Sequence, residues 1–308
     1  MITRTHQMNA KQLADLEMLM ANCKDADKNV IPVYKHLIDK RHTLSCNTLY
    51  YEGEKLIGYL RPFFFYATAC EITMMVDPQH RRHGVARSLM NEILPILQQE
   101  NMENFIFSTP KDCHHDWFTQ LEFSFRNTEC QMQYDAQKPV TITHKPAQIR
   151  LATPNDIPAL VELDGICFPN KKIDPEDIFR NLLVTNNCAL FVLIKDDRVA
   201  GKAHIFKESD RARLTDIGVF PNYRSQGMAS CLIKHCINHA LINNKPKIVL
   251  DVEITNESAL KLYDGLGFNI TNTHDYWSTP KNVPEFGLSA FLHGSDAKKL
   301  GRENKDIQ

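Results

Sequence analysis

Two stretches of the chain repeat one arrangement of residues around a glycine. The first runs from Val76 to Ala86 and the second from Val219 to Ala229, and both read Val-x-Pro-x-x-Arg-x-x-Gly-x-Ala without a gap. If a strand ends at the valine and a helix begins at the glycine, the first amides of that helix lack backbone partners and lie at the positive end of its dipole. Glycine also lets a phosphate approach the backbone closely. The loop is therefore a candidate pyrophosphate cradle; an ordinary strand-to-helix turn is the alternative, which the duplication disfavours.

The spacing of the two loops indicates an internal duplication. Their glycines, Gly84 and Gly227, are separated by close to half of the 308 residues. A chain of this length is long for one domain and comfortable for two. The simplest interpretation is two copies of one domain.

Hydrophobic spacing predicts the elements that position each loop. In each half a helix precedes a β-hairpin, the loop joins a strand to another helix, and an apolar strand and a short helix with an aromatic end follow. The expected elements of the first half are 9–23, 34–38, 46–51, 56–66, 86–97, 104–108 and 117–123. Those of the second half are 149–152, 154–163, 175–183, 189–195, 198–206, 229–242, 247–254 and 262–268. Residues 136–147 are polar and flanked by prolines, which predicts a linker. The tail from 280 has little periodicity, and residues 301–308 are expected to be disordered.

The composition excludes several classes of protein. Lys and Arg total 36 against 37 Asp and Glu, so the net charge of -1 offers no basic excess for a nucleic acid. No apolar stretch reaches the ~20 residues of a membrane span, and the first residues do not have the layout of a secretory signal. Nine scattered cysteines predict neither a zinc site nor a disulfide framework, and the run 113–115 is interpreted as a polar loop, not a metal site. A reducing cytoplasm is the expected compartment.

The loop resembles the coenzyme A pyrophosphate loop of the Gcn5-related N-acetyltransferase (GNAT) superfamily, in which Arg-x-x-Gly-x-Gly/Ala follows a strand. The second half carries the rest of the family's pattern as Asn256, Tyr263, Gly267 and Phe268. The resemblance covers about residues 148–278 strongly and 1–135 more weakly. It implies an α/β (α+β) fold of two consecutive GNAT domains, each a mixed, mostly antiparallel twisted sheet flanked by helices. These would be an N-terminal domain at 1–135 and a C-terminal domain at 148–308, joined by the linker 136–147.

The resemblance further implies acetyl-CoA-dependent transfer of an acetyl group to an amine in the C-terminal domain. The amides of Ile217, Gly218 and Val219 would pair with the pantetheine arm and polarise the thioester carbonyl, and Asn256 would touch the same arm. The pyrophosphate would be held by Arg224, Ser225, Gln226, Gly227, Met228, Ala229 and Ser230. The equivalent coenzyme-binding residues of the first half would be Val76, Arg81, Arg82, His83, Gly84, Val85, Ala86 and Arg87.

The same resemblance makes Tyr263 the general acid that protonates the departing thiolate, because a phenol is neutral at pH 7. Aromatic packing is the alternative for Tyr263, as a helix N-cap is for Asn256. The candidate bases are Asp251, then Asp216, then Glu253, and an acidic residue matches the place of Asp251 in protein-amino-terminus acetyltransferases of the family. Asp251 and Glu253 share one face of their strand. A solvated or cross-strand carboxylate, or a water relay, is equally compatible with each.

The first half departs from the family pattern at three places. Phe118 stands where the tyrosine is expected, Lys111 where the asparagine is expected, and Glu122 replaces the glycine before Phe123. These differences predict a catalytically degenerate domain with a structural or regulatory role. The opposing hypothesis is that the first site works without a general acid, because a thiolate is a tolerable leaving group.

The acceptor is expected to be an amine on a protein, a peptide or an amino sugar. Tyr276 and Trp277 would line an acceptor groove or pack as aromatics of an edge strand. A coenzyme A-binding regulatory or interaction protein without turnover is one alternative, and a mycothiol synthase-like enzyme, disfavoured by the Lys-, Asn- and Ile-rich composition, is another. Length and composition suit the tandem bacterial effectors typified by VipF, which would imply delivery into a host cell. A monomer without metal, nucleic-acid or membrane partner is expected.

Overall fold

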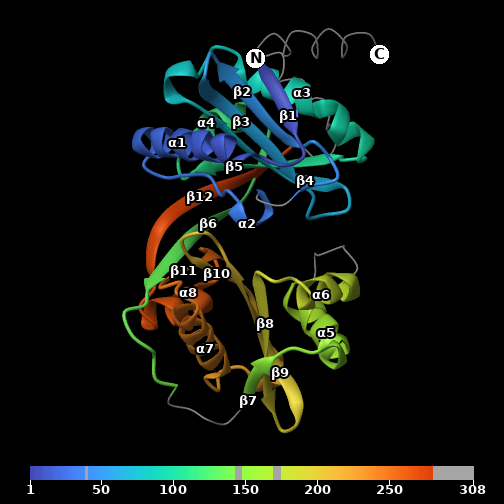
Figure 1. Cartoon of the computed structure of the whole chain (residues 1–308), viewed down its shortest axis with the longest axis vertical. Coiled ribbons are helices and arrows are strands. Elements are labelled where there is room, and N and C mark those ends of the chain that lie inside the picture. The colour runs from blue at the N-terminus through green and yellow to red at the C-terminus, as the bar shows by residue number, and fades with distance from the viewer. Residues whose placement is uncertain (39–40, 143–147, 169–174, 280–308) are drawn as a thin grey trace. The chain divides into compact units, whose positions relative to one another are not determined.

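The computed structural model describes residues 1–38, 41–142, 148–168 and 175–279. These residues form two compact units (Figure 1). Unit 1 contains Met1–Glu129 together with the segment 272–279, and unit 2 contains Cys130–Thr271. No helix in these ranges is both long enough and apolar enough to cross a membrane.

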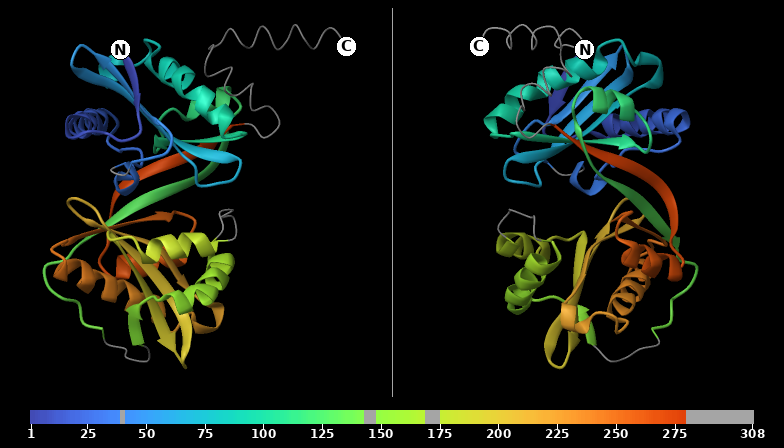
Figure 2. Two further views of the ribbon diagram at one scale, coloured as in Figure 1. Left: turned by 45° about the vertical axis from the view of Figure 1, so that its right-hand side comes forward. Right: turned by 180° about the vertical axis from the view of Figure 1, so that it is seen from behind.

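Unit 1 is a mixed sheet with helices on both faces (Figures 1 and 2). One face packs on α1 (Ala10–Asp27), and the other packs on α3 (Val85–Gln99). The described strands follow the order β1-β2-β3-β4-β5-β12-β6, and only β4 and β5 run parallel among the pairs whose register is defined. The elements are β1 (Ile2–Thr5), α2 (Lys35–Ile38), β2 (Asn47–Glu52), β3 (Lys55–Phe63), β4 (Ala69–Val76), β5 (Asn104–Pro110), α4 (His115–Gln120), β6 (Ser124–Asp135) and β12 (Asn269–Ser278).

Unit 2 repeats this arrangement. Its sheet follows the order β6-β11-β10-β9-β8-β7, and the one parallel pair of defined register joins β10 to β11. The face toward α7 carries the largest apolar cluster of the unit, and α5 and α6 cover the other face (Figure 1). The elements are β7 (Gln148–Leu151), α5 (Ile157–Cys167), α6 (Pro175–Leu183), β8 (Cys188–Lys195), β9 (Arg198–Lys207), β10 (Ala212–Val219), α7 (Met228–Ile242), β11 (Lys247–Glu253) and α8 (Glu257–Gly265).

The duplication is visible in the element boundaries. Strand β10 lies as far from β4 along the chain as Gly227 lies from Gly84, and the same spacing relates α7 to α3 and β11 to β5 at both ends of each element. The prediction that each half contains a mixed, mostly antiparallel sheet is confirmed.

Strands β6 and β12 each contribute residues to both units. Strand β12 pairs with β5 through five residue pairs, from His274 opposite Pro110 to Ser278 opposite Ile106. The last described strand of the chain therefore completes the sheet of unit 1. The compact units therefore do not coincide with the expected segments 1–135 and 148–308. The sequence does not show which sheet a strand joins, because any sequence can supply the backbone hydrogen bonds of a sheet.

The described part of the expected linker packs on unit 2. Asn238 of α7 accepts a hydrogen bond from the Val140 amide (2.7 Å) and donates one to the Val140 carbonyl (2.9 Å). Val140 and Ile142 also contact the apolar cluster of unit 2. Residues 143–147 of the linker and the tail from 280 lie outside the described residues.

Candidate active site

The two glycine loops have the same backbone conformation. Gly227 (φ 75°) precedes the first residue of α7, and Gly84 (φ 81°) precedes the first residue of α3. Two positions earlier, Ser225 (φ 58°) and Arg82 (φ 66°) also occupy the left-handed region, which residues with a Cβ rarely adopt. A Cβ added to either glycine would meet no atom within 4 Å, so both loops face open space. The glycines are needed for their positive φ and for access to the helix amides.

An arginine secures each loop to the strand that precedes it. Arg224 Nε donates to the carbonyl oxygen of Val219 at 3.0 Å, and Arg81 Nε donates to that of Val76 at 3.2 Å. The expected role of both arginines in phosphate binding is therefore joined by a structural role that sequence reasoning missed. The equal spacing of valine and arginine in the two loops was the sequence signal that could have indicated this structural role.

Strand β10 contains a β-bulge, and it lies at the expected pantetheine-binding residues. Its pairing with β9 runs from Ala212 to Thr215 and resumes at Gly218, so two residues of β10 lie opposite one residue of β9. Asp216, the first of these two, has φ 50°, a conformation that Asp tolerates better than most residues. The extra residue takes Asp216 and Ile217 out of the register with β9.

Unit 1 has no counterpart of this bulge within its described residues. Strand β4 pairs with β3 in one continuous register, from Gly58 opposite Val76 to Phe63 opposite Glu71. The two strands are of equal length. Their difference is therefore a local change of register and not a missing element.

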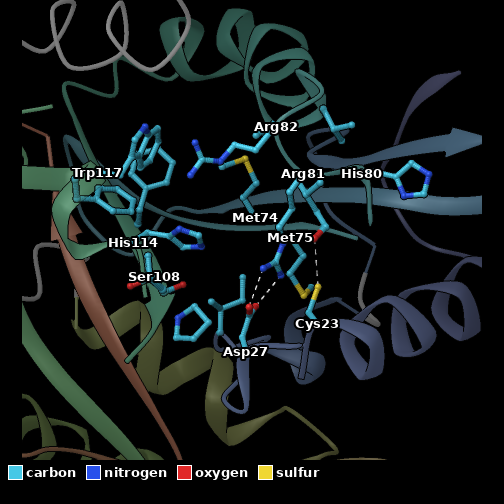
Figure 3. Close-up of a pocket in the computed structure, with 18 of the residues that line it drawn as sticks. Cys23, Asp27, Met74, Met75, His80, Arg81, Arg82, Ser108, His114 and Trp117 are labelled. Carbon is cyan, nitrogen blue, oxygen red and sulfur yellow. Dashed lines mark hydrogen bonds and ion pairs between the residues drawn. The ribbon is translucent and has the colours of Figure 1, made fainter. Parts of the chain in front are cut away.

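In each unit the two parallel strands pair only near their beginnings. Strands β10 and β11 share two residue pairs, and β4 and β5 share four, before each pair of strands diverges. In unit 1 the diverging strands border a cleft of about 400 Å³ (Figure 3). All of the coenzyme-binding residues expected in the first half except His83 line this cleft.

The cleft of unit 1 is crossed by an ion pair. Both terminal nitrogens of Arg81 donate to the carboxylate of Asp27 at 2.7 Å (Figure 3). Asp27 is available because α1 continues to it beyond Cys23, whereas α5 ends at Cys167. The matching arginine of unit 2, Arg224, contacts the Cys167 sulfur at 3.7 Å.

A short segment after α1 closes one side of the same cleft. Asn29, Val30 and Ile31 line it. Asn272 of β12 accepts from the Val30 amide (2.7 Å) and donates to the Val30 carbonyl (2.6 Å), and Asn29 accepts from the Thr273 amide (3.1 Å). The segment is therefore fixed to the sheet of its own unit.

Tyr263 lies on α8 and is buried in the apolar cluster of unit 2. Its ring centroid is 5.9 Å from that of Phe268. Burial raises the pKa of Tyr263 to about 12, so the phenol keeps its proton at neutral pH. Phe118 takes this place in unit 1, stacks on Trp277 with centroids 5.5 Å apart, and lines the cleft.

Asn256 is the N-cap of α8. Its side-chain oxygen accepts hydrogen bonds from the Ala259 amide (3.2 Å) and the Ser258 hydroxyl (3.0 Å). The capping alternative is therefore correct, and it uses the oxygen of the side-chain amide and not its nitrogen. In unit 1 the residue before α4, His114, makes no side-chain cap.

Asp251 is exposed on β11 and is engaged by an arginine. Arg213 donates to one oxygen of its carboxylate, and Gln131 donates to the other at 3.3 Å. Arg213 also donates to the buried Glu208 at 2.7 Å. Asp251 therefore makes the cross-strand contact that the sequence offered as an alternative, and its role as a base stays a prediction.

Asp216 belongs to a different set of charged side chains, three of which sequence reasoning missed. Its carboxylate lies 3.5 Å from Nδ1 of His204, and the other ring nitrogen of His204 lies 3.5 Å from the ammonium of Lys202. Lys202 is fully buried and forms an ion pair with Asp164 of α5. Lys202 and His204 lie two residues apart and share one face of β9. Polar residues on one face of a predicted strand were the sequence signal that could have indicated this set.

Two further expectations concern side chains outside this set. Tyr276 and Trp277 are buried in unit 1, on a strand that is interior in the strand order, so the expected edge strand is wrong while the expected core packing is correct. None of the nine cysteines, all of which lie in the described residues, forms a disulfide. Among the described residues no three His, Cys, Asp or Glu side chains are grouped as metal ligands.

Comparison with known proteins assigns these features to a family. The model of the acetyltransferase (GNAT) family matches the chain twice, at residues 10–116 and 157–268. The two matches together cover more than half of the chain, and each includes one glycine loop. The protein belongs to the GNAT family and contains two copies of its domain.

Relatives agree at the level of sequence and of fold. The chain is 33% identical over 88 residues to [ribosomal protein bS18]-alanine N-acetyltransferase of Salmonella typhimurium, which is 28% of this chain and 60% of the relative. The chain thus spans about 60% of the length of the curated relatives it matches at this level. A GCN5-related N-acetyltransferase from Sphaerobacter thermophilus superimposes with a TM-score of 0.73 at 13% identity, covering 90% of this chain and 95% of that one. A tandem GNAT protein from the clavulanic acid biosynthesis pathway gives a TM-score of 0.67 at 11% identity over 90% and 97%. Similarity to these two structures concerns the fold alone.

Proposed function

We propose that the protein is an acetyl-CoA-dependent N-acetyltransferase whose transfer site is in unit 2. The observation that carries the proposal is the bulge in β10. It takes Ile217 out of the register with β9 beside the diverging strands, and the Ile217 amide donates there to the thioester carbonyl. Donors already in place where negative charge develops are a large source of catalysis.

The loop of unit 2 fits the pyrophosphate of the co-substrate. Gly227 caps α7 without a side chain, so the amides that follow it are open to an anion at the positive end of the helix. The open space around Gly227 leaves room for a phosphate. Backbone amides supply the binding, which explains how a chain of net charge -1 can hold a polyphosphate.

The reaction needs two proton movements that side chains of unit 2 can serve. Acetyl-CoA supplies the thioester; a C–N bond forms at its carbonyl carbon, and the C–S bond breaks with its electron pair left on sulfur. Tyr263, held neutral by burial, donates its proton to that sulfur. A carboxylate takes the proton that nitrogen loses as the C–N bond forms, and this proton then restores Tyr263. The ammonium that enters has already lost its first proton to solvent, so one proton is released in each turnover.

The acceptor proposed first is the amino terminus of a protein or peptide. The relative from Salmonella typhimurium is named for the alanine of a ribosomal protein. Asp216 and Asp251 place two carboxylates in unit 2, which suits an acceptor that arrives as an ammonium. An amino sugar is the second acceptor class.

For unit 1 we propose binding of the coenzyme without transfer. Its loop carries Arg81, Arg82 and Arg87, whereas the unit 2 loop carries Arg224 alone. Its cleft has a closed side at 29–31, an unbulged strand, and Phe118 in place of a phenol. A binding module without turnover remains the second candidate for the whole protein, and the cleft of unit 1 is the observation that favours it.

The test is incubation of the full chain with acetyl-CoA and a panel of amines, read by mass spectrometry and by thiol release. The panel holds peptides with free amino-terminal alanine, the same peptides with blocked termini, and glucosamine. We expect acetylation at the free amino terminus and loss of product with Tyr263→Phe. Tight coenzyme binding with no thiol release for any amine would favour the binding module and contradict the proposal.

A further inference from the structure

The four charged or titratable side chains around the bulge form one connected line. It runs from Asp164 on α5 through Lys202 and His204 on β9 to Asp216 on β10. The first three are buried, and only the Asp216 side chain, at 22% exposure, is accessible from solvent. The line therefore begins inside the unit and ends at the bulge.

Burial makes such an arrangement costly without a compensating role. Lys202 has no exposed side-chain surface, and besides Asp164 it faces the ring of Phe179 with its ammonium 4.8 Å from the centroid. A buried ion pair commonly stabilises a protein less than apolar residues of similar volume would. Clusters of this kind are enriched at functional sites.

The ammonium of Lys202 faces one ring nitrogen of His204 and so favours one tautomer of the neutral ring. An ammonium can only donate, so the ring nitrogen that faces it, Nε2, must accept. The proton of the neutral ring is then on Nδ1, which faces the Asp216 carboxylate at 3.5 Å. His204 is thereby directed to donate to Asp216, in a contact long enough to tighten when substrate binds.

We propose that Asp216 accepts the proton of the attacking nitrogen and that His204, its tautomer fixed by Lys202 and Asp164, is the residue that positions this carboxylate. This rests on the proposed function. The N–H bond breaks with its electron pair left on nitrogen, an O–H bond forms on Asp216, and His204 keeps its own proton throughout. Asp251 is the weaker candidate because it lies on β11, outside the bulge, and forms an ion pair with Arg213.

Unit 1 does not repeat the line. At the same spacing, Lys202 and His204 correspond to Tyr59 and Arg61, and Asp216 corresponds to Thr73. Tyr59 and Arg61 both donate to Asn47, at 3.1 and 2.9 Å. The line of charged groups and the bulge therefore occur in the same unit.

The first experiment compares carboxylates in the full chain, with acetyl-CoA and the best peptide of the amine panel. Asp216→Asn keeps the shape and suits the positive φ, so it is expected to fold and to lower kcat by about 100-fold with little change in KM for acetyl-CoA. Asp251→Asn is expected to lower kcat by less than about 5-fold. Full kcat in Asp216→Asn would overturn the proposal, whereas absence of turnover in the unaltered protein would overturn the proposed function itself.

The second experiment separates positioning from packing. His204→Asn can donate from the place of Nδ1 and is expected to keep kcat within about 5-fold, whereas His204→Leu is expected to lose about 10-fold or more. His235→Leu is the matched control, because that half-buried histidine of α7 contacts Phe191 and is remote from the line by sequence and element. Equal kcat in His204→Leu and His204→Asn would contradict a positioning role.

The third measurement does not depend on turnover. Nitrogen-15 shifts of the imidazoles report the tautomer, and the His204 signal is assigned by its loss in His204→Asn. We expect the proton on Nδ1 in the unaltered protein and a shift toward Nε2 in Lys202→Met. A proton on Nε2 in the unaltered protein would overturn the proposal even if acetyl transfer is found.

Discussion

Strands β4 and β10 occupy the same place in the two units and have the same length, yet they pair differently with their neighbours. Strand β4 keeps one register along β3, whereas β10 takes in an extra residue at Asp216 and Ile217. The glycine loops that follow them differ much less: both helices start after a glycine at positive φ, and both arginines bond to the valine five residues before. The two units therefore share the conformation of the glycine loop and differ in the register of the strand next to the expected thioester, β4 in unit 1 and β10 in unit 2. A coenzyme loop made of backbone tolerates changes of side chain, whereas a transfer site depends on one register shift and on particular side chains.

The largest effect is expected from the two glycines. Gly227→Glu brings a Cβ and a carboxylate into a loop with positive φ and a phosphate, and should lower kcat/KM for acetyl-CoA by at least about 100-fold. Gly84→Glu should lower turnover by no more than about 3-fold while abolishing the coenzyme binding proposed for unit 1. Steady-state kinetics and calorimetric titration measure the two effects. Loss of transfer with Gly84→Glu alone would place the chemistry in unit 1 and reverse the comparison.

The next effect concerns the general acid. Tyr263→Phe should lower kcat by about 100-fold, because the departing thiolate then lacks a positioned proton. The drop should be smaller for a thioester with a more acidic thiol, which needs less protonation. Adding Phe118→Tyr should not restore turnover, because β4 has no bulge within the described residues. Recovery of transfer in that double variant would show that the hydroxyl alone separates the two units.

The contributions to stability made at the N-terminal ends of α1 and α5 should differ in their dependence on pH. Hydrogen bonds from Arg150 lower the pKa of Asp156 to about 2, against a usual value near 3.8. A lowered folded-state pKa stabilises the fold above pH 4 and loses that contribution as pH falls toward 2. Since Arg150 is partly exposed, we expect about 1 kcal/mol.

The measurement is the free energy of unfolding of Asp156→Asn and the unaltered protein, by denaturant titration between pH 2 and 7. The two should converge at the acid end. Asn9 and Gln12 form the neutral capping box of α1, so Asn9→Ala should cost about 1 kcal/mol at every pH. A constant difference for Asp156→Asn across this range would exclude the ionic contribution.

The smallest effect separates the two roles of Asn256. Asn256→Ala removes the N-cap of α8 and should cost about 1 kcal/mol, whereas Asn256→Ser keeps a capping oxygen. If the side-chain amide also touches the pantetheine arm, both variants should raise KM for acetyl-CoA by about 3- to 10-fold. An unchanged KM in Asn256→Ser would leave Asn256 with the capping role alone.

Much of the fold and of the loops could be predicted because their signals are local. The match between the stretches at Val76 and Val219 predicted two domains, and the family model matches both halves. The helix expected from Asn9 begins at Ala10 with Asn9 as its cap. Glycine spacing, hydrophobic period and capping residues act within a few positions of the chain, so the sequence displays them directly.

The preference for Asp251 over Asp216 shows where such signals end. Both are carboxylates on polar strand positions, and nothing in either strand reports that Arg213 bonds to one and that His204 lies beside the other. The alternation of Lys202 and His204 was visible, but not the helix residue, Asp164, that pairs with the lysine. These partners come from elements far apart in the chain.

By itself, the sequence determined that a loop-bearing domain occurs twice and that only the second copy has the tyrosine and asparagine of the family pattern. The tertiary structure decided three other points: the bulge in β10, the set of side chains around Asp216, and the pairing of β12 with β5 in unit 1. The physical reason is common to all three. Strand register and strand partners depend on backbone hydrogen bonds that every residue type can form, and buried charges are paired by packing across elements.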